Sequence, residues 1–387
     1  MPEFAFATCQ NIVFEFGAAS RLAEICAPYQ VSSVLLVMDP GLFQLGLHKE
    51  AVLSFENAGI DYQIYSDVQA DPPESVVLRA IEVAREKLVD AVIGFGGGSS
   101  MDVAKIVSLL AHPESEQSLQ TVYGVGLAKG KRLTLVQIPT TAGTGSEVTP
   151  VAIVTTGETT KAGIVTPLFL PDIAVLDASL TMGLPSDVSA ATGVDAMVHA
   201  IEAYTSNIRK NPLSDMLARE ALRLMGDNIH TAVHQGDNRD AREAMLLGSM
   251  LAGQAFANAP VAAVHALAYP LGGHFHIPHG LSNALVLTQV MRFNLPVACD
   301  AYAELAALIF PKINFSKDTL EASTQLIHCL EDLIASLGLP TCLKDAGVPE
   351  DFLPTLAKDA MLQTRLLVNN PRPLNIEDAL AIYQAAY

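Results

Sequence analysis

Four residues in the second half of the chain have the side chains and spacing of a metal site. Asp195 and His199 are four positions apart in a segment with helical periodicity, so both project from one helix face and can reach one ion. His265 and His279 are 14 residues apart in a stretch without charged side chains. Burying imidazoles in apolar surroundings is costly unless each has a partner, and one metal ion is a partner for several at once. The pattern therefore predicts a buried metal site.

The donor set restricts the metal. Three imidazoles and one carboxylate with an open position suit Zn²⁺ or Fe²⁺, whereas Mg²⁺ and Ca²⁺ prefer shells of oxygen atoms. The sequence does not choose between zinc and iron. An Asp/His pair at this spacing is also common as a plain surface hydrogen bond. His274 and His276 lie in the same uncharged stretch and have two interpretations, as side chains that line a cleft or as ordinary core histidines.

A glycine-rich turn in the first half predicts a site for phosphate groups. The apolar run 91–95 leads into Gly96–Ser100, and a helical pattern containing Asp102 and Lys105 follows. Glycines let the backbone approach a ligand closely, and the N–H groups of a beginning helix attract an anion such as a pyrophosphate. The alternative is a plain tight turn, because the spacing is not G-x-G-x-x-G.

A second polar segment strengthens the prediction of a nucleotide site. Pro139–Glu147 follows the apolar run 134–138 and contains four hydroxyl side chains and two glycines. Asp39 ends an early apolar run, where an acid can accept both ribose hydroxyls of NAD and repel the extra phosphate of NADP. The alternative for Asp39 is a turn carboxylate before Pro40. Together these features favour NAD over NADP.

The elements that must position these residues alternate between strand and helix in the first half. We expect strands at 31–38, 62–65, 91–95 and 134–138, helices at 49–58, 74–87 and 101–111, and a turn at 39–41. Such alternation predicts a largely parallel sheet covered on both faces. Residues 4–16 have the pattern of a further buried strand that could serve an interface.

The second half of the chain has helical periodicity almost throughout. We expect helices at 190–204, 212–234, 239–258, 262–268, 281–294, 301–309, 319–337, 351–358 and 376–386. The change near Leu184 predicts two domains: an α/β domain that binds NAD, residues 1–184, and an all-helical metal-binding and catalytic domain, residues 185–387. Since no low-complexity linker separates them, we expect close packing with a cleft between them.

Composition excludes several classes of function. The chain has 387 residues, of which 50% are hydrophobic, and its 23 basic and 41 acidic residues give a formal net charge of −18. This acidic surplus argues against nucleic acid as a partner, because such proteins need clustered Lys and Arg. Residues 244–291 contain no Asp, Glu, Lys or Arg and four of the ten histidines. Prolines, amides and histidines interrupt this stretch, so it does not have the roughly 20 apolar residues of a membrane span.

Cysteine usage and the N-terminus indicate the compartment. Five scattered cysteines without a CxxC pair suggest reduced thiols. The first residues lack a basic region followed by an apolar one, so no secretory signal is visible. We therefore expect a cytoplasmic protein without a membrane partner.

Four motifs occur in a fixed order along the chain: GGGSSMDVAK (96–105), PTTAGTGSEVTP (139–150), ATGVDAMVHAIEAY (191–204) and VHALAYPLGGHFHIPHGLSNA (264–284). Together they resemble the iron-containing alcohol dehydrogenases, the group III NAD(P)-dependent family, over about residues 30–295. The resemblance implies a dehydroquinate synthase-like architecture, with a dinucleotide-binding domain, a helical metal domain, the active site between them, and a homodimer or larger homo-oligomer. The implied metal ligands are Asp195, His199, His265 and His279. The implied cofactor contacts are Asp39, Gly97, Gly98, Ser99, Asp102, Thr140, Thr141, Thr144, Thr149, Lys161 and Leu180.

Two positions depart from the family pattern. Tyr269 stands where many members have a histidine four residues after the third ligand, and Asp71 stands where many have an asparagine before a proline. Tyr269 can still donate a hydrogen bond or relay a proton, whereas Asp71 cannot make an amide contact to the nicotinamide side. We expect the catalytic proton to leave through His274, Tyr269 or ordered water, because both residues are near the ligands in the sequence.

The function predicted from these observations is hydride transfer between NAD(H) and a small, neutral alcohol or aldehyde, with the metal ion, Fe²⁺ or Zn²⁺, polarising the substrate oxygen. NADP is the less favoured cofactor. The alternatives are a dehydroquinate synthase-like or glycerol dehydrogenase-like enzyme on the same fold, and a nucleotide-binding relative without catalysis. A dehydroquinate synthase-like enzyme needs clustered Lys and Arg for its anionic substrate, and the metal segment has none.

Overall fold

The computed structural model describes residues 3–157 and 160–387, which fold into two compact units. The first, here called the sheet unit, consists of Ala7–Thr141 and Gly145–Met182. The second, the helical unit, consists of Gly183–Tyr387 together with Ala142–Thr144 and residues 3–6. The main division thus follows Met182.

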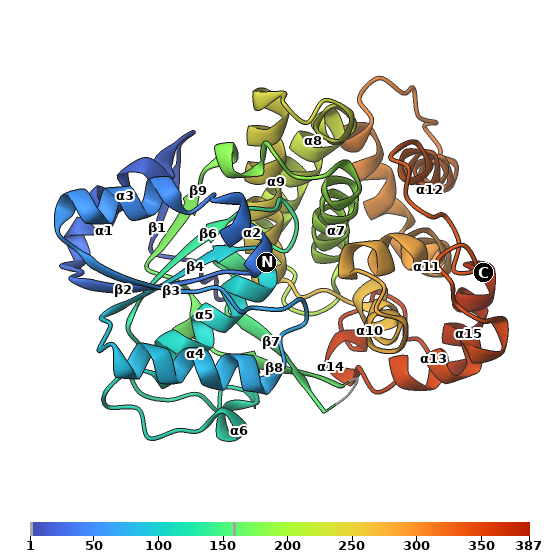
Figure 1. Cartoon of the computed structure of the whole chain (residues 1–387). Helices are drawn as coiled ribbons and strands as arrows, with labels where there is room; N and C mark the ends of the chain where they lie inside the picture. Colours follow the sequence, from blue (N-terminus) through green and yellow to red (C-terminus); the bar gives the residue numbers. More distant parts are fainter. Residues whose placement is uncertain (1–2, 158–159) are drawn as a thin grey trace. The chain divides into compact units, whose positions relative to one another are not determined.

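The sheet unit is built on six parallel strands in the order β1-β9-β6-β4-β2-β3 (Figure 1). Every neighbouring pair is parallel, which confirms the predicted parallel α/β class. The strands are β1 (Asn11–Phe14), β2 (Ser33–Val37), β3 (Asp61–Tyr65), β4 (Ala91–Gly96), β6 (Thr134–Pro139) and β9 (Ile173–Leu176).

Helices cover both faces of this sheet because its central strands are apolar on both sides. Leu35 and Val37 of β2 pack with the helices α4 and α5, whereas Val34 and Leu36 pack with α1 and α3. The helices and short 3-10 turns of the unit are η1 (Ala18–Arg21), α1 (Leu22–Cys26), η2 (Ala27–Tyr29), α2 (Pro40–Leu45), α3 (Lys49–Ala58), α4 (Glu74–Glu86), α5 (Gly98–Leu110), α6 (Leu119–Val122), η3 (Ser146–Val148), η4 (Pro167–Phe169) and η5 (Ala178–Thr181).

The strand order places a ligand site at one edge of the sheet. The chain runs from β2 outward to β3 and then crosses back past β2 to β4, so the order reverses between β2 and β4. Ligands of open parallel sheets bind at the carboxyl ends of the strands beside such a reversal. Asp39 follows β2 there, and the glycine turn before α5 follows β4.

Several parts of the sheet unit differ from the sequence prediction. A second sheet, with β5 (Gly124–Val125), β8 (Thr160–Val165) and β7 (Val151–Thr156) in the order β5-β8-β7, was missed, as was β9. The predicted turn at 39–41 is the start of helix α2, with Asp39 as N-cap and Pro40 in its first turn, a combination that favours helix initiation.

The prediction of a buried strand over 4–16 was also wrong. The strand β1 covers only Asn11–Phe14, and Ile12 and Phe14 are 40% and 42% exposed. As the edge strand, β1 has β9 as its one neighbour in the sheet. Its apolar side chains therefore lack the cover that central strands receive from both sides.

The helical unit matches the predicted all-helical half. Its elements are α7 (Ser186–Thr205), α8 (Pro212–His234), α9 (Arg239–Asn258), α10 (Ala263–Phe275), α11 (His279–Ile309), α12 (Thr319–Ser336), η6 (Glu350–Phe352), α13 (Leu353–Ala360), α14 (Thr364–Leu367) and α15 (Ile376–Ala385). The two helices predicted at 281–294 and 301–309 are one continuous helix, α11, which contains Pro296.

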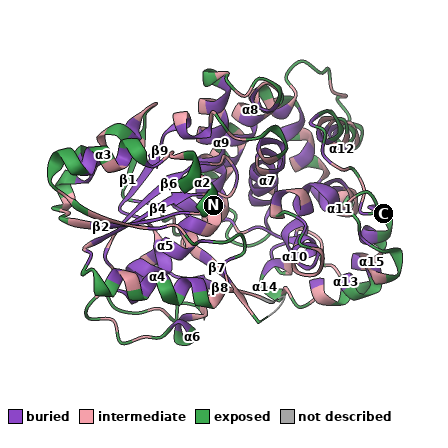
Figure 2. Cartoon of the chain, viewed as in Figure 1, coloured by how far each residue is buried: buried purple, intermediate pink, exposed green. Residues whose placement is uncertain are grey.

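The uncharged stretch 244–291 forms most of α9, all of α10 and the first part of α11. These segments are largely buried within the helical unit, as the purple ribbon of α9, α10 and α11 shows (Figure 2). Within the described part of the chain, no helix combines the length and apolar character that crossing a membrane requires.

Candidate metal centre and cofactor site

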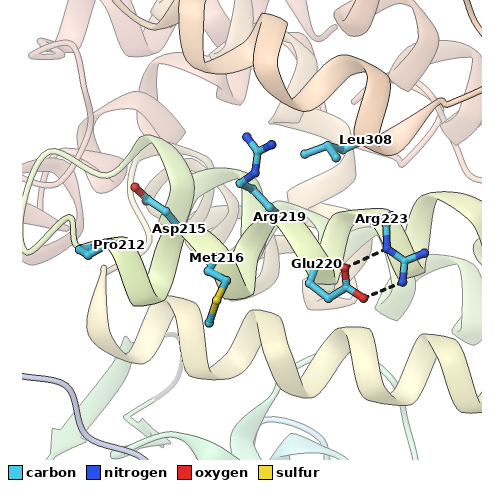
Figure 3. A pocket seen from close by; sticks show the side chains of 7 residues that line it. All are labelled: Pro212, Asp215, Met216, Arg219, Glu220, Arg223 and Leu308. Atoms are coloured by element: carbon cyan, nitrogen blue, oxygen red, sulfur yellow. Dashed lines mark hydrogen bonds and ion pairs between the residues drawn. The ribbon is translucent and has the colours of Figure 1, made fainter.

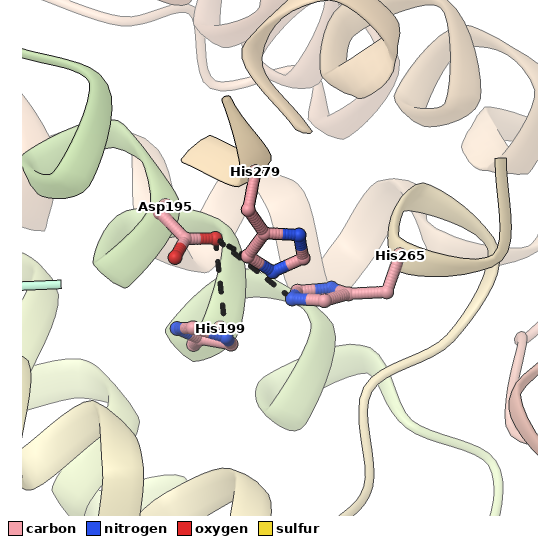
Figure 4. A group of neighbouring side chains, drawn as sticks. All are labelled: Asp195, His199, His265 and His279. Atoms are coloured by element: carbon pink, nitrogen blue, oxygen red, sulfur yellow. Dashed lines mark ion pairs between the residues drawn. The ribbon is translucent and has the colours of Figure 1, made fainter. Parts of the chain in front are cut away.

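The four predicted metal ligands converge at one point in the helical unit (Figure 4). Asp195 and His199 come from one face of α7, His265 from α10, and His279 is the first residue of α11. The Nε2 atoms of His199, His265 and His279 lie 3.9, 3.9 and 3.7 Å from Oδ1 of Asp195. All four candidate ligand atoms lie within 4.8 Å of one another, a spacing that one ion can bridge.

Burial sets the charge state of this cluster. Asp195, His199 and His265 are buried, whereas the side chain of His279 is 33% exposed, so the cluster is reachable from one side. Burial lowers the pKa of His199 and His265, which keeps both imidazoles neutral with a lone pair available. Burial also acts to raise the pKa of Asp195, but the charge that the three histidines carry when protonated and the hydrogen bond from Asn283 act in the opposite direction, and the net pKa is lowered.

Three imidazole nitrogens and a carboxylate oxygen are a donor set for Fe²⁺ or Zn²⁺. Their arrangement around one point on three different helices fits such an ion. Mg²⁺ and Ca²⁺ fit poorly, because three of the four donors are nitrogen.

Glu202 contacts Nδ1 of His265, the ring nitrogen that does not face the other ligands. The sequence alone did not single it out. Its Oε2 lies 2.6 Å from Nδ1 of His265, and its Oε1 accepts a 2.7 Å hydrogen bond from the backbone N–H of Val264. A carboxylate in this place fixes the imidazole with Nδ1 protonated and Nε2 facing the ion. The signal was present, since Glu202 follows Asp195 by seven residues and His199 by three and so shares their helix face.

Asn283 is a second missed residue of the cluster. It is fully buried, and its Nδ2 donates to Oδ1 of Asp195 at 2.6 Å and lies 3.3 Å from Nε2 of both His265 and His279. Because Asn283 follows His279 by four residues, both project from the same face of α11. Its amide thus holds the Asp195 carboxylate in place.

Replacing Glu202 with glutamine is expected to weaken metal affinity by about 10- to 100-fold, since the amide no longer accepts the Nδ1–H bond as a carboxylate does. Metal affinity is measured by competition with a chromophoric chelator. Glu304→Gln is the matched control. Glu304 also lies in the helical unit, but its carboxylate bonds Tyr204, which is not one of the four candidate ligands. Unchanged affinity in Glu202→Gln would show that His265 is oriented without this carboxylate.

The predicted cofactor residues of the sheet unit gather at the carboxyl ends of its strands. Asp39 follows β2 and accepts a 3.0 Å bond from the N–H of Leu42 as N-cap of α2. Gly97 is the N-cap of α5, with Gly98 and Ser99 in its first turn and no acidic residue there. Thr140 and Thr141 directly follow β6, the strand that pairs with β4. The N–H of Thr140 donates to the carbonyl of Gly96. The N-terminus of α5 is therefore a ready site for a pyrophosphate.

Four of the five remaining predicted contacts lie in three further places. Asp102 and Thr149 belong to a buried polar network around Lys105. Leu180 lies in η5 and is part of the core. Thr144 groups with the helical unit.

Lys161 of β8 is paired with Asp71, one of the two departures from the family pattern. Its Nζ lies 2.7 Å from Oδ1 of Asp71, whose backbone has a left-handed φ of 51°. The carbonyl of Asp71 also accepts from the hydroxyl of Thr155 in β7. The carboxylate that replaces the usual amide therefore engages the lysine that the family pattern assigns to the cofactor.

The two predicted proton-transfer residues have different surroundings. The ring of Tyr269 lies 6.0 Å from the ring of His279, centroid to centroid, which places it beside a ligand. His274 lies at the end of α10, and its Nε2 is 2.6 Å from Oδ2 of Asp359. His276 is exposed and caps α10 with a left-handed φ of 54°, so the interpretation of His276 as a core histidine was wrong.

A separate surface hollow of about 580 Å³ lies along α8 (Figure 3). Both of its arginines have acidic partners: Arg223 donates two bonds to Glu220, and Arg219 lies 3.7 Å from Glu304. The hollow offers no convergent set of metal or nucleophilic groups comparable with the ligand cluster. Its lining residues are Pro212, Asp215, Met216, Arg219, Glu220, Arg223 and Leu308.

The parallel sheet with a glycine turn beside its reversal point, and a helical unit with an Asp/His₃ cluster, define a metal-dependent oxidoreductase linked to a dinucleotide. Comparison with known proteins gives the family. The model of "Iron-containing alcohol dehydrogenase" matches residues 9–178, and that of "Fe-containing alcohol dehydrogenase family, C-terminal" matches residues 189–387. The chain belongs to the iron-containing alcohol dehydrogenase family.

Individual relatives agree over nearly the full chain. Long-chain-alcohol dehydrogenase 1 of Geobacillus thermodenitrificans (strain NG80-2) is 40% identical over 96% of this chain and 94% of its own length. The crystal structure of a 1,3-propanediol oxidoreductase has a TM-score of 0.95 at 35% identity and covers 100% of both chains. Sulfoacetaldehyde reductase from Bifidobacterium kashiwanohense, solved with NAD⁺, has a TM-score of 0.88 at 29% identity, over 100% of this chain and 99% of its own.

The predictions of fold class, family and enzyme class are therefore confirmed: the chain is an alcohol dehydrogenase of this family, and it has a group of four side chains that could hold a metal ion. Nothing in these comparisons favours the dehydroquinate synthase-like or non-catalytic alternatives.

Proposed function

We propose that this enzyme oxidises small, neutral, partly apolar alcohols and reduces the matching aldehydes, with NAD(H) preferred over NADP(H) and Fe²⁺ preferred over Zn²⁺. The observation that carries the proposal is the Asp195, His199, His265 and His279 cluster, placed among uncharged helices. A divalent ion bound there supplies Lewis acidity, which lowers the pKa of an alcohol in oxidation and polarises a carbonyl in reduction.

The chain's own residues prepare this chemistry. Asp195 and the three imidazoles hold the ion, Glu202 fixes the orientation of His265, and Asn283 fixes that of Asp195. A bound nicotinamide cofactor would supply or accept the hydride, and the protein's part would be to align that cofactor with the substrate carbon and to exclude water. Because residues 244–291 carry no Asp, Glu, Lys or Arg, a bound ion would be the main positive charge that these residues place beside the substrate oxygen.

The substrate class follows from the side chains beside the ligands. Phe256 stacks on His199 with ring centroids 4.4 Å apart, and Tyr269 lies beside His279. These rings favour an apolar group next to the reacting carbon. A substrate with an acidic tail is therefore the informative competitor.

The cofactor preference rests on Asp39. Its position after β2 is where a carboxylate accepts the ribose hydroxyls of NAD and repels the 2′-phosphate of NADP. The backbone N–H groups at the start of α5 and the hydroxyls of Thr140 and Thr141 are the proposed partners of the pyrophosphate and adjoining ribose. A cytoplasmic location and a homo-oligomeric state stay predictions.

We propose Tyr269 rather than His274 as the nearer proton relay. The ring of Tyr269 lies 6.0 Å from the ring of the ligand His279, whereas His274 lies at the end of α10, where its Nε2 contacts Asp359. Profiles of kcat/KM from pH 6 to 10 on Tyr269→Phe and His274→Ala test this assignment. If both variants keep the wild-type profile, neither residue is the relay.

The deciding experiment is a substrate panel on protein reconstituted separately with Fe²⁺ and Zn²⁺. The readout is the formation or consumption of NADH, measured by its absorbance. The panel contains straight-chain alcohols of increasing length, 1,3-propanediol, and aldehydes with and without an acidic tail. We expect NADH formation with neutral alcohols, higher activity with Fe²⁺, and weak activity with NADP. Preference for the acidic aldehyde would overturn the substrate class, and absence of any NADH formation or consumption would overturn the proposal.

A further inference from the structure

Lys105 is a charged side chain that the proposed reaction does not use, although it lies in the middle of the cofactor-binding half. It is 0% exposed on α5. Its ammonium donates to the hydroxyl of Ser146 at 2.6 Å, the carbonyl of Val151 at 2.7 Å and the hydroxyl of Thr149 at 3.1 Å. An ammonium has three N–H donors, which these three bonds share with a longer one to Oδ1 of Asp102.

Asp102 extends these contacts into a network. Its Oδ1 accepts from Ser146 at 2.7 Å and lies 3.4 Å from Nζ of Lys105, and its Oδ2 accepts from the N–H of Ile153 at 2.9 Å. We call Lys105, Asp102, Ser146 and Thr149 the Lys105 network. It joins α5, the segment around η3 and the strand β7.

The network connects the two segments that carry the proposed NAD contacts. Lys105 ends the motif that begins with the glycine turn, and Ser146 and Thr149 belong to the hydroxyl-rich motif after β6. The two segments also touch at the sheet edge, where the N–H of Thr140 donates to the carbonyl of Gly96 at 3.0 Å. The network therefore fixes the hydroxyl-rich segment against α5, the helix whose N-terminus is the proposed binding site for the phosphates of NAD.

Stability alone is a weak reason to bury an ammonium here. Burial lowers the pKa of Lys105, with Asp102 acting in the opposite direction. A buried ion pair can often be replaced by apolar groups of the same shape without loss of stability, because desolvation offsets much of the attraction. What an apolar side chain cannot do is hold three specific oxygens from two other segments at fixed positions.

We infer that Lys105 is a positioning residue for NAD(H): through Ser146 and Thr149 it sets the place of the hydroxyl-rich segment relative to the N-terminus of α5. The inference rests on the proposed use of NAD(H) in this unit. It assigns Lys105 no contact with the cofactor itself.

The test is Lys105→Met, which keeps an unbranched side chain, one atom shorter than that of lysine, and removes its donors. We expect the Kd for NADH to rise by about tenfold or more, the order of one hydrogen bond to a charged group. The KM for NAD should rise by a similar factor, while kcat at saturating NAD changes less than about threefold and metal content stays at the wild-type value. NADH binding is measured by fluorescence titration of the full-length, metal-loaded protein.

Arg132→Met is the matched control. Arg132 also crosslinks segments of the sheet unit, since it bonds the carbonyls of Leu168 and Leu170 and pairs with Asp172. It precedes β6, however, and so lies at the edge of the sheet opposite the glycine turn. We expect Arg132→Met to lower Tm without changing the Kd for NADH.

If Lys105→Met does not fold, Ser146→Ala decides, because it removes one acceptor of Lys105 at little cost in volume; a rise of about threefold in the Kd for NADH is expected. A wild-type Kd in the folded variant would overturn the inference, as would an equal rise in Arg132→Met. Failure of the wild-type protein to bind NADH would instead overturn the proposed cofactor, which keeps the two outcomes separate.

Discussion

Replacing either His265 or His279 with alanine is expected to lower kcat/KM by about 10³-fold or more and to abolish tight metal binding. The reason is that each imidazole supplies one of four donors that converge within 4.8 Å. Loss of the ion removes several kcal/mol of stabilisation of the charge that develops on the substrate oxygen, and each 1.36 kcal/mol corresponds to about tenfold in rate.

Two measurements separate loss of the metal from loss of the fold. Metal content by atomic emission should fall well below one ion per chain in both variants, while NADH binding stays near the wild-type value, because the proposed NAD contacts other than Thr144 lie in the sheet unit. His230→Ala, at an exposed position of α8, is the control and should keep both properties. Normal activity in either ligand variant would rule out the four-ligand assignment.

The two variants should differ in stability. His265 is 2% exposed and paired with Glu202, so His265→Ala leaves a buried carboxylate without its imidazole partner, which costs about 1–3 kcal/mol. Removal of His279, whose side chain is one-third exposed, leaves no such group. Thermal unfolding of the metal-free proteins should therefore show a lower Tm for His265→Ala than for His279→Ala.

The core of the fold could be predicted from the sequence where one physical signal dominates. Fully apolar runs such as 91–95 and long periodic segments such as 212–234 leave one low-energy choice of element, and the structure has β4 and α8 there. Prediction failed where tertiary neighbours decide. The strands β7 and β8 depend on each other as a hairpin, and Pro296 lies inside α11, although proline usually ends a helix.

In the candidate site, too, some residues could be predicted from the sequence and others could not. The clustering of Asp195, His199, His265 and His279 could be predicted, because few side-chain types bind a metal and because Asp195 and His199 are one helical turn apart. Glu202 shares the helix face of Asp195 and His199, and Asn283 that of His279, but a glutamate or asparagine in a helix is ordinary. The folded structure adds that Glu202 contacts His265 and that Asn283 contacts Asp195. The Lys105 network is a similar case: its acceptors lie 41 to 46 residues further along the chain.

Gly280→Ala is the second substitution with a large expected effect. Gly280 follows His279 at the start of α11 and packs against α7, where a Cβ at this position would lie 2.3 Å from the carbonyl oxygen of Ala191 and 3.2 Å from Cβ of Asp195. Backbone atoms of a buried helix cannot move aside cheaply, so α11 and α7 must separate. We expect a loss of about 1–3 kcal/mol in the free energy of unfolding, typical of overpacking.

The larger consequence is for the metal, because the helices that separate carry Asp195, His199 and His279. The metal affinity of Gly280→Ala should fall by at least about tenfold, because moving α7 and α11 apart takes the ligand side chains out of the positions in which they can share one ion. Gly226→Ala is the matched control: its Cβ would lie 2.3 Å from the carbonyl oxygen of Ile309, so it forces α8 away from the far end of α11. Both variants should therefore lose stability, and only Gly280→Ala should lose metal affinity, as measured by chelator competition. Equal affinities in the two would mean that the spacing of α7 and α11 does not set the ligand geometry.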